Sequence, residues 1–65
     1  MKEIKHRFDE LLEKAKEGDG PSQLKLAKWL AKGHLVEKDL EAAKYWAFKA
    51  TMANVVGAGE FYETL

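Results

Sequence analysis

Apolar side chains in this sequence return at helical spacing in four segments, and this periodicity constrains the fold more than any other feature. Residues that stop helices or form turns separate the segments: Gly18, Pro21, Gly33, Asp39 and Asn54. No stretch shows the alternation with a period of two that a strand requires. We therefore expect one all-α domain over residues 1–65. Its four short helices are expected at residues 2–17, 22–32, 39–53 and 56–65.

The four segments differ in how much of their circumference is apolar, and this difference predicts where each helix lies. Residues 2–17 carry one narrow apolar stripe, formed by Ile4, Phe8, Leu11, Leu12 and Ala15. Such a helix packs on one side only, as a cap does. Residues 22–32 are apolar over well over half of the circumference, so this helix is expected to be buried between neighbours. Gly57 and Gly59 weaken the fourth helix.

The length and the lack of cysteine limit the stability of such a domain. A core in a chain of 65 residues rarely supplies more than about 3–5 kcal/mol without disulfides, a metal or oligomerisation. The sequence contains no cysteine. We therefore expect self-association or a partner to add stability.

Net charge and hydropathy bound the partners and the location. Eleven basic and eleven acidic residues cancel, so the chain as a whole does not attract nucleic acid or an anionic membrane. The N-terminus is charged throughout and lacks the apolar run of a signal peptide, and no stretch is apolar enough to span a membrane. The sequence predicts a soluble, cytoplasmic protein.

Small, aromatic and turn residues from the end of the first segment through the third occur in a recognisable order. They are Ala15, Gly18, Asp19, Ser22, Gln23, Leu26, Ala27, Leu30, Gly33, Val36, Asp39, Ala43, Trp46 and Ala50. This pattern resembles the Sel-one-like repeat, a helix-turn-helix relative of the tetratricopeptide repeat. The resemblance covers residues 15–58 and implies stacked antiparallel helical hairpins. The small residues Ser22, Ala27, Ala43 and Ala50 would let two helices approach closely, and Trp46 would fill the wedge between them.

The sequence holds about one full repeat, and the helices on either side of it look like caps. A weak internal match supports this reading, since a shift of thirty-six residues sets Gly18 on Asn54 and Ser22 on Ala58.

Residues suited to catalysis or metal binding do not form a recognisable site. His6 and Glu10 lie four apart on one helical face, but a zinc site needs three or four ligands. Ser22, Thr51 and Thr64 have no histidine at a spacing that suggests an activating base. The glycines after the first helix follow a helix rather than a strand, unlike a phosphate loop. We expect no enzyme activity, no metal and no cofactor.

The third segment carries a second apolar stripe, formed by Tyr45, Phe48 and Met52 at positions i, i+3 and i+7. Lys44 and Lys49 separate it from the face expected to be buried, which comprises Leu40, Ala43, Trp46, Ala47 and Ala50. Two interpretations stay open. The stripe packs against the last helix through Val56 and Phe61, or it is an exposed contact surface for a protein partner or a second copy of the chain.

The second segment carries a lysine edge, defined by Lys25, Lys28, Trp29 and Lys32. Lysines beside a tryptophan suit phosphate contacts with base stacking. The alternative is a solvated face beside a buried tryptophan, and the neutral net charge favours this alternative.

These observations predict a small protein–protein interaction module that acts by occluding or bridging a target. Its size and fold suggest, by analogy, a regulator or inhibitor of bacterial or phage origin. The rival functional interpretation is a nucleic-acid-binding accessory protein that uses the lysine edge. A third interpretation is a repeat fragment without a function of its own.

Overall fold

Four helices account for most of the part of the chain that the structure describes. The computed structural model describes the backbone of residues 2–33 and 36–65, and the side chains of residues 7–33 and 36–65. The helices are α1 (Lys2–Lys16), α2 (Gly20–Lys32), α3 (Leu40–Met52) and α4 (Ala58–Glu63). No strand occurs within the described ranges. The prediction of an all-α fold with four helices is confirmed.

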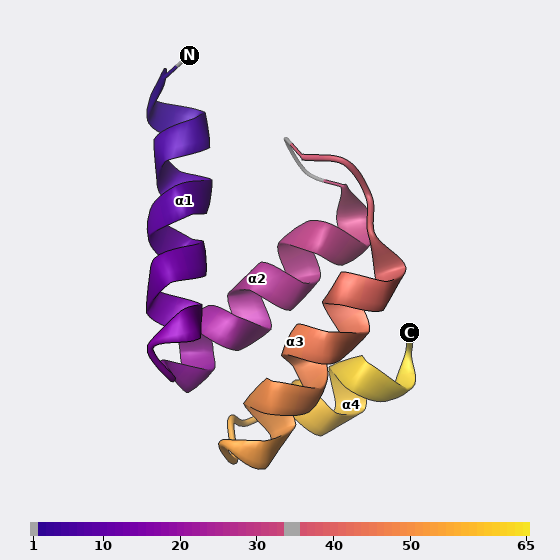
Figure 1. Cartoon of the computed structure of the whole chain (residues 1–65). Helices are drawn as coiled ribbons and strands as arrows, with labels where there is room; N and C mark the ends of the chain where they lie inside the picture. Colours follow the sequence, from indigo (N-terminus) through magenta and orange to yellow (C-terminus); the bar gives the residue numbers. More distant parts are fainter. Residues whose placement is uncertain (1, 34–35) are drawn as a thin grey trace.

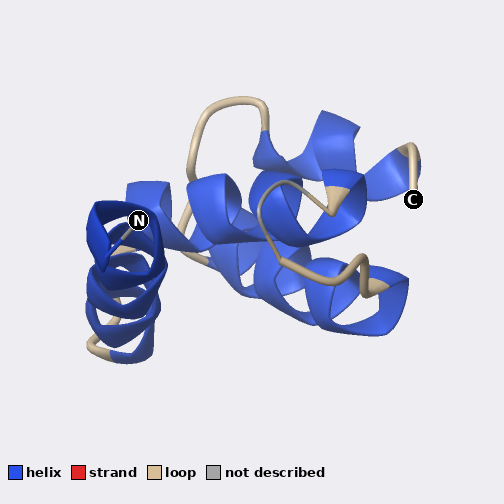
Figure 2. Ribbon diagram, turned by 90° about the horizontal axis from the view of Figure 1, so that it is seen from above, coloured by secondary structure: helices blue, strands red, loops and turns tan. Residues whose placement is uncertain are grey.

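The helices follow one another across the molecule in chain order, and each runs against the direction of the one before (Figure 1). The most extensive contacts join α1 to α2, α2 to α3 and α3 to α4. Viewed from above, α1 lies at one edge of the molecule and the C-terminus at the opposite edge (Figure 2). As expected from its wide apolar surface, α2 lies between two neighbours. None of the helices in the described part of the chain is long and apolar enough to cross a lipid bilayer.

Local side chains and turn residues fix the ends of the helices. The carboxylate of Asp39 accepts a hydrogen bond from the Ala42 N–H at 3.1 Å and caps α3. Gly33 ends α2 in the left-handed conformation, with φ of 71°. The Asp19 carboxylate accepts from the Ser22 N–H at 3.1 Å, so α2 begins at Gly20, two residues before its expected start.

The last helix is shorter than expected. Its N-cap is Gly57, which has φ of 84° and offers no side chain to cap the first turn. The helix therefore begins at Ala58 instead of residue 56, and it ends at Glu63 instead of residue 65.

Small side chains lie at the centre of the helix packing. The side chains of Ala27, Ala43, Ala47 and Ala50 are wholly inaccessible to solvent, and we call these four the buried alanines. Because an alanine side chain ends at Cβ, helices that meet through alanines can lie close together. Ser22 is also buried, so every position expected to allow a close approach is buried.

A cluster of larger apolar side chains continues from the buried alanines toward α1. It contains Leu11, Ala15, Leu26, Leu30 and Ala43, with partly buried apolar side chains around it. Leu11 and Ala15 belong to the stripe predicted for the first helix, and Phe8 and Leu12 pack against the cluster. The remaining member, Ile4, lies outside the described side chains, as do His6, His34 and Leu35.

The tryptophans lie at the margin of this core rather than inside it. Trp46 was expected to fill the wedge between helices, but it is only partly buried and its ring meets that of Tyr45 edge-to-face at 5.0 Å. Trp29 is also partly buried, with Phe8 edge-to-face at 5.9 Å. Leu40 was expected on the buried face and is 44% exposed. Close approach through alanines leaves no room for large rings, and Leu40 is the first residue of α3, at the end of its packed face.

Two residues at the start of α2 join distant parts of the chain. Gln23 is 97% buried, and its Nε2 donates a hydrogen bond to the Ala15 carbonyl at 3.0 Å, which ties α2 to the end of α1. A Cβ at Gly20 would lie 2.6 Å from Cγ2 of Val55. The absence of a side chain at Gly20 thus allows the turn between α3 and α4 to rest against the start of α2.

Leu26→Ala is predicted to unfold most of the protein. Leu26 is fully buried, and such a truncation costs about 2–5 kcal/mol, comparable to the whole stability of a small domain. The matched control is Leu40→Ala, which deletes the same atoms from an exposed site. Urea denaturation followed by circular dichroism measures both. Equal losses for the two variants would mean that Leu26 is not in the core.

Gln23→Ala is predicted to lower the free energy of unfolding by about 1–3 kcal/mol, because it leaves the Ala15 carbonyl without its donor in a buried site. Lys25→Ala, an exposed position on the same helix, serves as the control and should change stability little. A Gln23→Ala variant as stable as the control would show that the hydrogen bond to α1 contributes nothing.

Candidate functional site

The clearest exposed apolar surface lies on α3 and α4. Tyr45, Phe48 and Met52 are 55%, 51% and 69% exposed, and Tyr62 of α4 is 39% exposed. The ring of Tyr62 lies 6.1 Å from that of Phe48, tilted by 54°. We call these four residues the apolar face. Three of them are the predicted protein-partner residues, and the structure adds Tyr62.

Neighbouring side chains position the rings of the apolar face. Tyr45 meets Trp46 edge-to-face, and the ammonium group of Lys49 lies 5.6 Å from the centre of the Tyr45 ring, within range of a cation–π interaction. Phe48 and Met52 are one helical turn apart and therefore adjacent on the surface of α3. The side chains of the apolar face therefore contact neighbouring residues and form one continuous group.

The last helix does not cover the stripe in the way that one interpretation required. Val56 is 95% exposed, and Phe61 lies beside α2, with the Lys28 ammonium 5.8 Å from its ring centre. Packing of the stripe through Val56 and Phe61 is therefore wrong. Val56 falls in the turn before α4 and so cannot pack from that helix, and Tyr62 meets Phe48 in place of Phe61.

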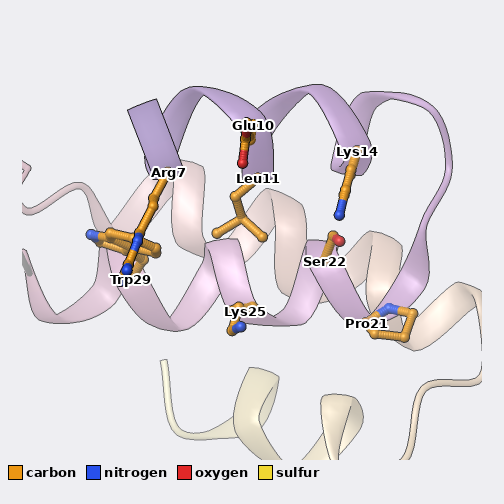
Figure 3. A pocket seen from close by; sticks show the side chains of 8 residues that line it. All are labelled: Arg7, Glu10, Leu11, Lys14, Pro21, Ser22, Lys25 and Trp29. Atoms are coloured by element: carbon orange, nitrogen blue, oxygen red, sulfur yellow. The ribbon is translucent and has the colours of Figure 1, made fainter. Parts of the chain in front are cut away.

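A second candidate surface is a groove between α1 and α2 with a volume of about 640 Å³ (Figure 3). We call it the basic groove. Its lining residues are Arg7, Glu10, Leu11, Lys14, Pro21, Ser22, Lys25 and Trp29. Arg7 reaches from α1 toward Trp29 of α2, and Lys14 reaches toward Ser22 (Figure 3). The lining that the structure describes thus combines three cationic side chains from two helices with one carboxylate, that of Glu10.

The lysine edge adjoins this groove. Lys25, Lys28, Trp29 and Lys32 line a hollow of about 250 Å³. Lys25 and Trp29 line both spaces, so the hollow and the basic groove are neighbours on α2. The structure therefore brings the four predicted residues together and extends their positive surface onto α1.

Arg7 and Lys14 were not among the site residues predicted from the sequence, because the prediction for the first helix rested on its apolar stripe. A signal was available, since Arg7 and Lys14 are seven residues apart and Leu11 lies between them. Residues at that spacing share one face of a helix. A cation on each side of a core leucine marks the rim of a helix–helix contact.

The hydroxyl groups considered as nucleophiles serve local structure. Ser22 Oγ donates to the Asp19 carboxylate, Thr51 Oγ1 donates to the Ala47 carbonyl at 2.9 Å, and Thr64 Oγ1 donates to the Phe61 carbonyl at 2.6 Å. Among the described residues no three histidine, aspartate or glutamate side chains gather as metal ligands. The surfaces with recognisable chemistry are thus the apolar face and the basic groove.

Comparisons of the chain with protein-family models, with curated proteins and with solved structures gave no match.

Proposed function

We propose that this protein is a small interaction module that binds a target protein through the apolar face and occludes a site on it. The observation that carries the proposal is the exposure of Tyr45, Phe48 and Met52 on one side of α3. Exposed aromatic and methionine clusters mark interaction surfaces. A small regulator or inhibitor, of bacterial or phage origin, fits this mode of action.

The energy available at this face suits a protein contact. Full burial of a large apolar side chain contributes about 1.5–3 kcal/mol. Roughly half of that remains to be gained at side chains that are 51–69% exposed. Lys44 and Lys49 on α3 and Glu60 and Glu63 on α4 are all exposed, so the two helices that carry the rings also present both signs of charge to solvent. An apolar centre with a charged rim is typical of a protein interface, and the rim sets orientation.

We further propose that the scaffold is a Sel-one-like helical repeat, and recurring turn geometry supports this proposal. The Asp19 N–H donates to the Lys14 carbonyl after α1, and thirty-six residues later the Val55 N–H donates to the Ala50 carbonyl after α3. Gly18 and Asn54, set on one another by the same shift, both have positive φ, 99° and 62°.

The other hydrogen bonds of these two turns correspond at the same spacing. After α1, backbone N–H groups donate to carbonyls from Glu17 to Glu13, from Glu17 to Lys14 and from Gly18 to Ala15. After α3, the corresponding bonds run from Ala53 to Lys49, from Ala53 to Ala50 and from Asn54 to Thr51. Such recurrence is what a structural repeat requires of its junctions. The burial of the small residues at the repeat positions supports the same reading.

A second candidate function is nucleic-acid binding by an accessory protein. The observation in its favour is that the lysine edge lines one hollow with Trp29, a combination suited to phosphate contacts and base stacking. The neutral net charge and the small number of cations argue against it, since affinity grows with the number of phosphates neutralised.

The double variant Phe48→Glu, Met52→Glu is predicted to keep its fold and lose association. The matched control is Leu40→Glu, Val56→Glu, which places the same charges at exposed apolar sites outside the face. Circular dichroism, thermal melting, light scattering and retention of a partner from the source cells measure the outcome. Unfolding of the double variant would assign the stripe to the core, and equal loss in the control would remove the apolar face as the interface.

Nucleic acid is predicted to bind weakly at physiological salt, because the few clustered lysines release few counterions. Titration of labelled single and double strands measures the affinity. Submicromolar binding that is lost on replacing Lys25, Lys28 and Lys32 with alanine would instead make nucleic-acid binding the leading function.

A further inference from the structure

The basic groove concentrates positive charge in a chain with no net charge. Arg7 and Lys14 project from α1 and Lys25 from α2, and all three side chains are exposed. Among the residues whose side chains the structure describes, Glu10 is the only carboxylate in the lining, so this described lining carries two more positive than negative charges. A ligand that matches the groove carries negative charge.

The floor of the groove is apolar. Leu11 is 8% exposed and belongs to the core cluster, and the partly buried Trp29 lies at one end of the groove and Pro21 at the other (Figure 3). The volume of about 640 Å³ falls within the range of about 300–1,000 Å³ typical of ligand sites. The groove can therefore bind an apolar side chain between cationic groups that pair with anions.

The position of Glu10 favours a peptide over a nucleic acid as the occupant. Glu10 lines the groove from α1 and lies between Arg7 and Lys14 along that helix (Figure 3). A continuous phosphate backbone would be repelled there. A peptide can place a backbone N–H opposite Glu10 and carboxylates opposite the cations on either side.

We propose that the basic groove binds an acidic segment of a partner protein, with an apolar side chain over Leu11 and Trp29 and carboxylates paired with Arg7, Lys14 and Lys25. This site uses α1 and α2 and is separate from the apolar face on α3 and α4. The module therefore has two contact surfaces, and the second selects its ligand by charge.

Isothermal titration of the unaltered chain with three peptides tests the proposal. The first peptide has a central leucine flanked by aspartates and glutamates, the second replaces the acids with asparagine and glutamine, and the third has the sequence of residues 57–65. Single-stranded oligonucleotide of matched charge is titrated in parallel. We expect the first peptide to bind most tightly. Its affinity should fall as the salt concentration is raised, because salt screens exposed charges.

Charge reversals locate the binding site. Lys25→Glu and Arg7→Glu should each lower the affinity for the acidic peptide by about fivefold or more. This change is equivalent to about 1 kcal/mol, the size of one ion pair. Lys16→Glu, an exposed position of α1 outside the groove, is the matched control and should have little effect. The Phe48→Glu, Met52→Glu variant should bind the peptide normally, so failure at the apolar face and failure at the groove are distinguishable.

Three results would overturn the proposal. Equal affinity for the amide peptide would show that charge does not select the ligand. Tighter binding of the oligonucleotide would assign the groove to nucleic acid, and tighter binding of the 57–65 peptide would assign it to a second copy of the chain. Circular dichroism of each variant confirms that a lost signal is not lost folding, and agreement between Lys25→Glu and Arg7→Glu guards against an effect peculiar to one of them.

Discussion

The close packing of α2 and α3 through alanines is the constraint on which the rest of the molecule depends. Side chains that end at Cβ bring the two helices together but bury little apolar area each. The larger leucines extend the core toward α1. Both tryptophans, by contrast, lie at its margin, and Tyr45 and Phe48 lie outside it. The use of alanine at the contact between α2 and α3 thus makes the core small and leaves aromatic rings at the surface.

The sequence predicted the helices well because local residues determine where they end. Asp39 caps α3 with its own carboxylate, and Gly33 adopts the left-handed conformation that only glycine takes readily. The functional surfaces were less predictable, because they depend on how helices meet. Lys14 faces Ser22 only because α1 packs on α2. The contacts of α4 were likewise not predictable: Tyr62 meets Phe48 and Phe61 meets Lys28, and adjacent residues point about 100° apart on a helix.

The two candidate surfaces belong to different ends of the helix series. The basic groove lies between the first two helices, and the apolar face lies on the last two. Because consecutive helices make the most extensive contacts, an occupant of one surface contacts elements that the other occupant does not. This arrangement is compatible with bridging two partners. In the two functions proposed for them, charge selects the ligand at one surface and apolar area supplies the affinity at the other.

The residues of the apolar face belong to two helices that differ in how firmly their ends are fixed. Three of its residues belong to α3, which has 13 residues and a carboxylate cap, whereas Tyr62 belongs to a helix of six residues that begins at an uncapped glycine. Short helices depend on tertiary contacts for their stability, and such elements open at a lower free-energy cost than the core. Opening of α4 would separate Tyr62 from Phe48 and enlarge the exposed ring surface. A partner that contacts both rings would favour the arrangement in which Tyr62 lies against Phe48. Binding would then slow amide hydrogen exchange in α4.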